Sequence, residues 1–213
     1  MKVAILGASG FAREARSTID DLVRAGRDFT VIGFVDVNLP IGTDVAGLPV
    51  LGNEGWFSSP EARDVRAVIG IGDPAIRRRA VEGVVKNGGD FVTIIHPSVV
   101  MGRNISVGRG CLFLQSSSLT TDISIGDFVS INPGVTIGHD ATVEDFANLS
   151  PGARLSGFVR ICQGADIGAG AVVLPGLTVG RDAVMGAGAV ATKDVPDGLT
   201  VVGVPARTLE RKP

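Results

Sequence analysis

The chain is short of several residue types, and each shortage excludes a kind of structure. It has no tyrosine, one tryptophan and 5% aromatic residues, so its core cannot be built around large rings. Its two cysteines, Cys111 and Cys162, lie far apart and exclude a disulfide framework. Few cysteines favour a reducing compartment, and we expect a cytoplasmic protein.

A large excess of charge of one sign and long apolar runs are also lacking. Lys and Arg number 20 and Asp and Glu 22, so the net charge of −2 gives no reason to expect a nucleic acid or an anionic membrane as partner. No apolar run approaches the roughly 18 residues of a membrane span. The N-terminus has no signal-peptide layout, and we expect no membrane span.

Glycine is abundant instead, and a six-residue repeat explains many of the 30 glycines. Every sixth residue from Met101 to Ala191 is apolar, and the residues two positions earlier, from Val99 to Ala189, are small or aliphatic. Alternation over so short a segment predicts a strand, and a strict period of six does not fit a helix. We therefore expect a column of short strands over residues 99–194.

A second, longer period predicts how the strands close into coils. Gly134, Gly152, Gly170 and Gly188 recur at every third hexad. Three hexads then form one coil, and these glycines occupy one corner of successive coils, where a Cβ atom obstructs the backbone. An ordinary antiparallel sheet would need hairpins at irregular spacing. The pattern therefore predicts a triangular prism with a narrow aliphatic core.

Residues 1–95 carry no hexads and alternate between strand and helix patterns. The expected strands are 3–6, 30–36, 49–52, 67–72 and 91–95, and the expected helices are 11–25 and 76–87. This alternation predicts a small parallel sheet of the Rossmann-like α/β class, with a ligand crevice at the strand ends. We expect Arg77, Arg78 and Arg79 to form a solvated helix face.

The first strand ends in Gly7-Ala8-Ser9-Gly10, which opens the first helix. Free N–H groups at such a turn hold a phosphate or a diphosphate, although a tight strand-to-helix turn explains the glycines equally well. Asp36 ends the second strand and could accept a hydrogen bond from a ribose or sugar hydroxyl. The G-x-G-x-x-G spacing is incomplete, which weakens the alternative of a dinucleotide-dependent oxidoreductase.

Two histidines are present, and they differ in setting. His96 precedes Pro97 at the junction of the two halves, and an entry turn explains it. His139 stands in Ile137-Gly138-His139-Asp140 at an outward corner, where packing does not require an imidazole and where it could accept a proton near neutral pH, oriented by Asp140. Two histidines cannot supply the three zinc ligands of a β-helical carbonic anhydrase, and we expect no metal.

Two amides and the cysteines complete the candidates in the second half. Asn132 lies seven residues before His139 and Asn148 nine after it. Each amide could bind a ligand through hydrogen bonds, or the asparagine could be present for a turn conformation. Cys111 is at an inward small position and is expected in the core. Cys162 is at a turn and receives no role.

The sequence resembles a known family. The hexads resemble the left-handed β-helix of the hexapeptide-repeat acetyltransferases. The α/β domain, His96-Pro97-Ser98, Ile137-Gly138-His139-Asp140 and Val202-Gly203-Val204-Pro205-Ala206-Arg207 resemble the branch of sialic acid O-acetyltransferases and bacterial nucleotide-aminosugar N-acetyltransferases. The resemblance implies a Rossmann-like nucleotide-sugar-binding domain at 1–95 and a left-handed β-helix with a C-terminal extension at 96–213.

The resemblance also implies an activity and a set of site residues. It implies a homotrimer with active sites between adjacent prisms, acetyl-CoA as donor and the amine of a UDP-, dTDP- or GDP-linked 4-aminosugar as acceptor. His139 matches the general base and Asp140 its acidic neighbour. Coenzyme A contacts fall on Asn148, Gly157, Ala169 and Ala187, with the Gly157 N–H facing the thioester oxygen. Sugar-nucleotide contacts fall on Ser9, Gly10, Phe11, Asp36, Gly72 and Asn132.

Two positions depart from the family pattern. Relatives usually carry histidine in place of Phe11, and some carry a second histidine in place of Asn148, whose amide cannot shuttle protons. The remaining alternatives are O-acetylation of a sialic acid or similar free sugar, and a trimeric binding scaffold without catalysis.

Overall fold

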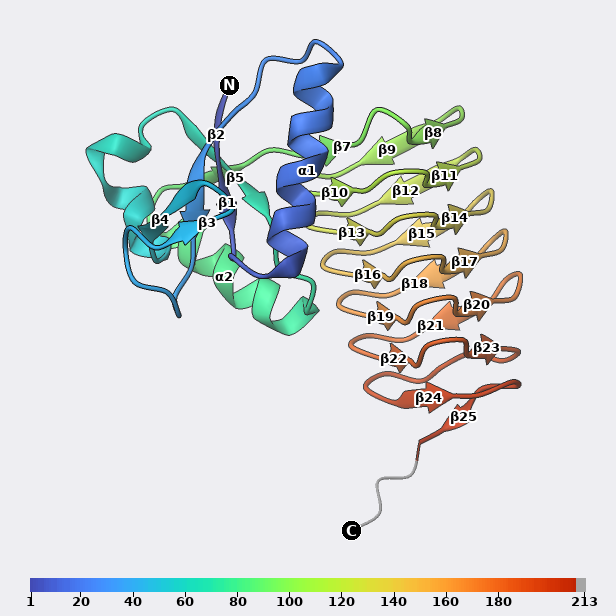
Figure 1. The fold of residues 1–213 in the computed structure, drawn as a ribbon. Helices are drawn as coiled ribbons and strands as arrows, with labels where there is room; N and C mark the ends of the chain where they lie inside the picture. Colours follow the sequence, from blue (N-terminus) through green and yellow to red (C-terminus); the bar gives the residue numbers. More distant parts are fainter. Residues whose placement is uncertain (210–213) are drawn as a thin grey trace. The chain divides into compact units, whose positions relative to one another are not determined.

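The computed structural model describes residues 1–209, and their contacts divide the chain into two units (Figure 1). The first unit comprises Met1–Pro97 and Arg109–Leu112, and the second comprises Ser98–Gly108 and the chain from Phe113 onward. The sequence-based boundary after residue 95 lies two residues before the end of Met1–Pro97. Residues 210–213 of the predicted second domain lie outside the described residues.

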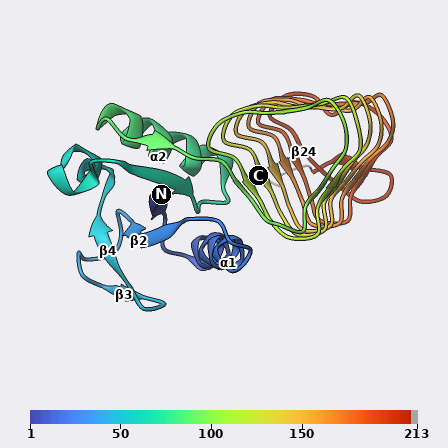
Figure 2. The ribbon, with the colours of Figure 1, turned by 90° about the horizontal axis from the view of Figure 1, so that it is seen from above.

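The first unit contains a mostly parallel sheet with helices on both faces. Its strand order is β3-β4-β2-β1-β5-β6, and only β3 (Asp44–Val45) pairs antiparallel with its neighbour. Figure 2 shows α1 on one face of this sheet and α2 on the other. The other elements are β1 (Lys2–Leu6), α1 (Gly10–Arg24), β2 (Thr30–Val35), β4 (Leu48–Gly52), η1 (Glu54–Ser58), η2 (Pro60–Ala62), β5 (Val65–Ile69), α2 (Pro74–Lys86), β6 (Asp90–Phe91) and β7 (Ile94–Ile95).

The predicted elements of this unit are confirmed, most of them with bounds shifted by one or two residues, whereas β3, η1 and η2 were not predicted. Two strands differ more. The strand expected at 67–72 ends at Ile69, because the chain turns through Gly70 and Gly72 before α2. The strand expected at 91–95 is divided between β6 and β7. The central strand β1 has β2 on one side and β5 on the other. The chain passes from β1 to β2 on one side and later reaches β5 on the other side of β1. Such a reversal opens a crevice at the carboxyl end of β1.

The expectation that Arg77 belongs to a solvated helix face is wrong. Its side chain is fully buried, because the helical period places it with Ala80, Val81 and Val84 on the buried side of α2. Its Nη1 atom donates hydrogen bonds to the carbonyl oxygens of Ile71 at 2.9 Å and Gly72 at 2.7 Å. These bonds compensate the guanidinium for lost hydration and fix the loop between β5 and α2.

The second unit is a left-handed parallel β-helix, as the repeat and the resemblance predict. Its coils appear end on as a rounded triangle in Figure 2. Strands pair in parallel with partners one coil away, for example Ser118 with Thr136 and Leu119 with Ile137. The strands are β8 (Val100–Met101), β9 (Ile105–Val107), β10 (Leu112–Phe113), β11 (Ser118–Leu119), β12 (Ile123–Ile125), β13 (Ser130–Ile131), β14 (Thr136–Ile137), β15 (Thr142–Val143), β16 (Asn148–Leu149), β17 (Arg154–Leu155), β18 (Arg160–Ile161), β19 (Asp166–Ile167), β20 (Val172–Val173), β21 (Thr178–Val179), β22 (Val184–Met185), β23 (Val190–Ala191), β24 (Thr200–Val202) and β25 (Arg207–Thr208).

The inward positions form the core of the prism. From Phe113 to Ala191 every sixth residue is at most 4% exposed. Met101, the first apolar residue of the repeat, is 37% exposed and lies outside this closed core. Its strand, β8, ends its sheet and has a paired strand on one side only.

Each hexad ends with a residue in the left-handed backbone region, which explains the corner glycines. Gly134, Gly152 and Gly170 have φ of 69°, 70° and 66°. A Cβ atom there would have open space around it, so backbone conformation rather than crowding favours glycine. The N–H of Gly152 donates to the carbonyl of Pro133 at 2.9 Å, which links successive coils. The predicted corner is confirmed.

Candidate active site

His139 lies at a corner of the β-helix, directly after β14. Its side chain is 53% exposed, so the ring faces away from the prism core. Asp140 has φ of 57°, and its Oδ2 atom lies 2.8 Å from Nδ1 of His139. A carboxylate accepts from a protonated Nδ1, which leaves the Nε2 lone pair as the proton acceptor of the neutral ring.

Gly157 lies three hexads after His139, in the next coil, and its missing side chain makes room for the ring. A Cβ atom on Gly157 would come within 2.6 Å of both Cε1 and Nε2 of His139. The imidazole therefore lies over the backbone of the next coil. This position is also where the resemblance expects a backbone N–H to face the thioester.

Phe158 is a residue of this corner that sequence reasoning missed. Its ring meets the His139 ring edge to face, with centroids 5.1 Å apart and planes at 89°. Its N–H donates to the His139 carbonyl at 2.8 Å. Phe158 is 62% exposed and has φ of 59°, which is unusual for an aromatic residue. The same hexad position also holds Phe128 and Phe146, so the available signal was that Phe158 lies one coil after Asp140.

Replacing Gly157 with alanine is expected to displace the His139 ring without unfolding the coil. A group misplaced by about 1 Å costs on the order of 100-fold in rate, so kcat is expected to fall by about 10- to 100-fold. Steady-state kinetics of Gly157→Ala beside Ser156→Ala, a neighbouring change at the same turn, measures this effect. Equal kcat values for the two variants would contradict the assigned contact.

The structure joins the predicted Asn132 and Asn148 in a buried ladder of amides. Each residue is 7% exposed. Nδ2 of Asn132 donates to the Leu149 carbonyl at 2.9 Å and to Oδ1 of Asn148 at 3.2 Å. Nδ2 of Asn148 donates to Oδ1 of Asp166 at 2.7 Å. The ladder links successive coils, and its predicted contacts with ligands stay predictions.

Ala169 and Ala187 lie at the corner of the prism that carries Gly170 and Gly188. Both alanines are exposed, and the carbonyl of Ala169 accepts from the Gly188 N–H at 2.8 Å. Small side chains there leave the surface of successive coils open. The arrangement is compatible with the predicted coenzyme A contacts, which stay predictions.

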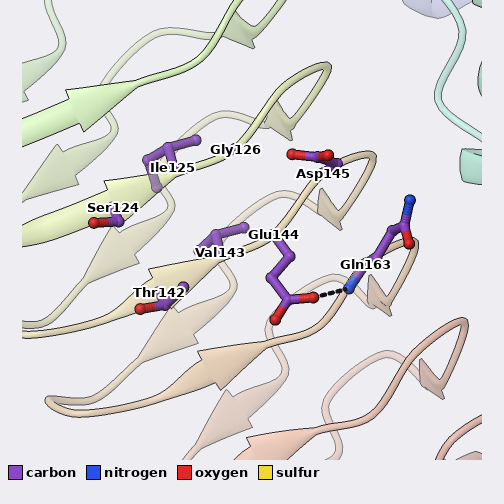
Figure 3. Close-up of a pocket in the computed structure, with 8 residues that line it drawn as sticks. All are labelled: Ser124, Ile125, Gly126, Thr142, Val143, Glu144, Asp145 and Gln163. Carbon is purple, nitrogen blue, oxygen red and sulfur yellow. Dashed lines mark hydrogen bonds between the residues drawn. The ribbon is translucent and has the colours of Figure 1, made fainter.

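A separate hollow of about 340 Å³ lies beside β12 and β15 and holds none of the predicted site residues (Figure 3). Glu144 in this hollow accepts from Nε of Arg160 at 2.8 Å and from the Gln163 N–H at 3.0 Å. Burial, followed by the Glu144 charge, raises the pKa of the nearby Cys162 thiol. A raised pKa disfavours the thiolate form of Cys162.

The first unit has a cavity of about 590 Å³ at the carboxyl ends of β1, β2 and β5. Three predicted residues line it, Ser9, Asp36 and Gly72. Oδ1 of Asp36 accepts from the Asn38 N–H at 2.8 Å. Gly10 and Phe11 begin α1 but do not belong to this lining, so their predicted contacts have no support from the cavity.

Sequence reasoning missed four polar residues of this cavity, Asn38, Glu54, Asp73 and Arg79. Arg79 is exposed, as the prediction of a solvated helix face requires, and it also lines the cavity. The helical spacing of Ile76, Arg79 and Gly83 was a signal, because these residues share one side of α2.

His96 has a structural partner within the first unit. Its Nε2 lies 3.0 Å from Oδ2 of Asp21, and the His96 side chain is 14% exposed. The hydrogen bond with His96, followed by that with Arg24, lowers the pKa of Asp21. The interpretation of His96 as a structural residue agrees with this contact.

The Asp21 contact predicts how stability changes in acid. A carboxyl whose pKa is lower in the folded state stabilises the fold above its unfolded pKa, and this contribution disappears as pH falls through the folded pKa. Thermal unfolding between pH 3 and 7 should show wild type above Asp21→Asn at neutral pH and the two converging below about pH 4. Asp20→Asn, which makes the same change of charge at the neighbouring residue of α1, is the control variant. A pH-independent gap would contradict the prediction.

Among residues 1–209, no group of three or more His, Cys, Asp or Glu side chains could hold a metal ion. In the same range, no helix is both long enough and apolar enough to cross a membrane.

The fold and the corner at His139 define a class of protein, the hexapeptide-repeat β-helix proteins with an α/β domain in front. Residues 2–84 match the family described as the PglD N-terminal domain. The GDP-perosamine N-acetyltransferase of Escherichia coli O157:H7 is 33% identical over 137 residues, which are 63% of this chain. The match spans 61% of the length of that relative, less than two thirds.

Two solved structures match nearly the whole chain. A histidine-to-asparagine variant of perosamine N-acetyltransferase from Caulobacter crescentus, in complex with CoA and GDP-perosamine, is 31% identical, with a TM-score of 0.89 over 99% of this chain and 98% of that one. The acetyltransferase domain of PglB from Neisseria gonorrhoeae FA1090, in complex with acetyl coenzyme A, is 30% identical, with a TM-score of 0.86 over 98% of each chain. The chain belongs to the hexapeptide-repeat acetyltransferases, in the branch that includes these nucleotide-aminosugar enzymes.

Proposed function

We propose that the protein transfers an acetyl group from acetyl-CoA to the amino group of a nucleotide-linked aminosugar. The observation that carries the proposal is the His139–Asp140 pair on an open corner, with Nε2 lying over Gly157. The solved relatives that match over nearly the whole chain bind CoA, acetyl-CoA or GDP-perosamine. Their names favour N-acetylation over the O-acetylation of a free sugar.

The proposed chemistry is direct acyl transfer. The acceptor nitrogen attacks the thioester carbonyl carbon while Nε2 of His139 takes the proton that the nitrogen loses. The N–H of Gly157 donates to the oxygen that becomes negative. The C–S bond then breaks, and coenzyme A leaves as a thiolate that takes up the proton held by the His139 imidazolium. Asp140 holds Nδ1 protonated and stabilises the imidazolium.

The cavity of the first unit is the proposed nucleotide site. The turn at Ser9 and Gly10 offers backbone N–H groups to the diphosphate, and Asp36 and Gly72 lie in the same lining as Ser9. Arg79 supplies a positive charge in that lining, and no partner within residues 1–209 neutralises it. Phe11 remains part of the proposal through the resemblance alone.

The coenzyme A contacts and the assembly complete the proposal. Asn148, Gly157, Ala169 and Ala187 would contact coenzyme A, and Asn132 would lie near the acceptor. The active protein would be a homotrimer, which sedimentation equilibrium measures directly. Because acetyl-CoA and sugar nucleotides are cytoplasmic metabolites, we place the reaction in the cytoplasm.

Acetyl-CoA consumption tests the reaction. The acceptor panel contains UDP-, dTDP- and GDP-linked 4-aminosugars and free sialic acids, and mass spectrometry identifies the acetylated atom. We expect turnover with a nucleotide-linked amine and an amide product. Turnover of sialic acid alone would favour the O-acetyltransferase alternative. Failure of acetyl-CoA to bind at millimolar concentration would favour the scaffold alternative.

A further inference from the structure

Glu54 reaches the nucleotide cavity from an element other than the Gly7–Ser9 turn. It is the first residue of η1, and it lines the cavity together with Ala80 and Gly83 of α2. A Cβ atom on Gly83 would lie 3.0 Å from Cγ of Glu54 and 3.1 Å from its Cβ. The glycine therefore leaves space for the glutamate side chain beside α2.

The Glu54 carboxylate has its hydrogen-bonding capacity available. Asp36 accepts from the Asn38 N–H, and Asp73, another carboxylate of the lining, accepts from the Ile76 N–H at 2.8 Å. Within residues 1–209 the Glu54 carboxylate forms no hydrogen bond or ion pair. A carboxylate has two oxygens that accept hydrogen bonds, so a ligand with two adjacent donors would satisfy it best.

The rest of this lining suits a flat ring. Val37 follows β2, and Ile76 and Ala80 stand on the cavity side of α2. Val37 is 62% exposed and Ile76 is 48% exposed, so both present apolar surface that a bound ring would cover. A base placed between these side chains would direct its polar edge toward η1.

Resting on the proposed function, the structure assigns Glu54 as the residue that reads the nucleobase, and the base that it selects is guanine. Guanine presents its N1–H and its N2 amino group side by side, which matches the two oxygens of one carboxylate. Uracil and thymine present one N–H between two carbonyl oxygens, which a carboxylate repels. A site built to accept two hydrogen bonds discriminates strongly against a base that lacks them.

Calorimetric titration of the full chain with GDP, UDP and dTDP tests the assignment. Wild type is expected to bind GDP at least 10-fold more tightly than UDP or dTDP. Glu54→Gln is expected to lose about 10- to 100-fold in GDP affinity, because a hydrogen bond to a charged group is the stronger kind. Its affinity for UDP should hold or rise, since an amide can pair with the N3–H and a carbonyl of uracil. Glu82→Gln, a neighbouring change of charge outside the cavity, should keep the wild-type preference.

A second variant separates base reading from folding. Gly83→Ala places a methyl group against the Glu54 side chain, and alanine favours a helix, so GDP affinity should fall while thermal stability is retained.

Each other outcome has a definite meaning. Wild type that binds UDP or dTDP as tightly as GDP overturns guanine selection and leaves the proposed function standing. A Glu54→Gln protein that keeps the GDP preference overturns the role of Glu54. Wild type that binds none of the three nucleotides overturns the nucleotide site of the proposed function as well.

Discussion

Replacing His139 with alanine is expected to abolish most turnover and leave the fold intact. Loss of a general base costs about 100- to 10,000-fold in rate, or about 3 to 5 kcal/mol of barrier. The side chain is 53% exposed and contributes no packing to the prism core, so the substitution creates no internal cavity. Steady-state kinetics with the true acceptor, beside circular dichroism and sedimentation, measure both halves of the prediction.

A variant of Asp140 supplies a second test of the His139–Asp140 pair. Asp140→Asn keeps a hydrogen-bond partner at Nδ1 but removes the charge, so it should lose less activity than His139→Ala. Wild-type turnover in His139→Ala would remove the residue from the mechanism.

Replacing Arg77 with methionine is expected to destabilise the first unit by about 2 to 4 kcal/mol, because hydrogen bonds from a buried charged group are lost. Methionine fills much of the same volume but cannot donate to the carbonyls of Ile71 and Gly72. Because Gly72 lines the cavity that we propose as the nucleotide site, nucleoside diphosphate affinity should fall together with stability. Urea unfolding and calorimetric titration measure the two effects.

Arg13→Met is the matched control for Arg77→Met. Arg13 is exposed on α1, so the same change of side chain and charge there should alter stability by less than about 0.5 kcal/mol. If the two variants unfold at the same urea concentration, Arg77 has no structural role of the kind its hydrogen bonds indicate.

The regularity of the repeat explains why the outward position of His139 could be predicted from the sequence. The position of His139 in its hexad places it outside the prism, and Asp140 follows in a left-handed turn. The equivalent residue one coil later is Gly157, whose contact with the ring follows from the three-hexad period once the coil is known. Phe158 escaped notice because its ring contact depends on a side-chain orientation that no repeat specifies.

The amide ladder was harder to predict. Asn132 and Asn148 are 16 residues apart, whereas register partners in successive coils are 18 residues apart. The repeat therefore does not predict that they meet. Their hydrogen bond forms because Asn132 extends past the end of β13 toward the next coil. A single residue type at a turn position did not distinguish this structural role from a ligand contact.

The sequence alone determined the β-helix, the α/β class of the first unit and the outward position of His139. These features depend on local hydrophobic periods along the chain. In the β-helix, each hexad repeats the same pattern of inward and outward residues. Tertiary structure decided which polar groups face a cavity and which are buried. The burial of Arg77 and the meeting of Glu54, Arg79 and Asp36 around one cavity depend on how separate elements pack, and hydrophobic periodicity carries no information on where a long polar side chain ends.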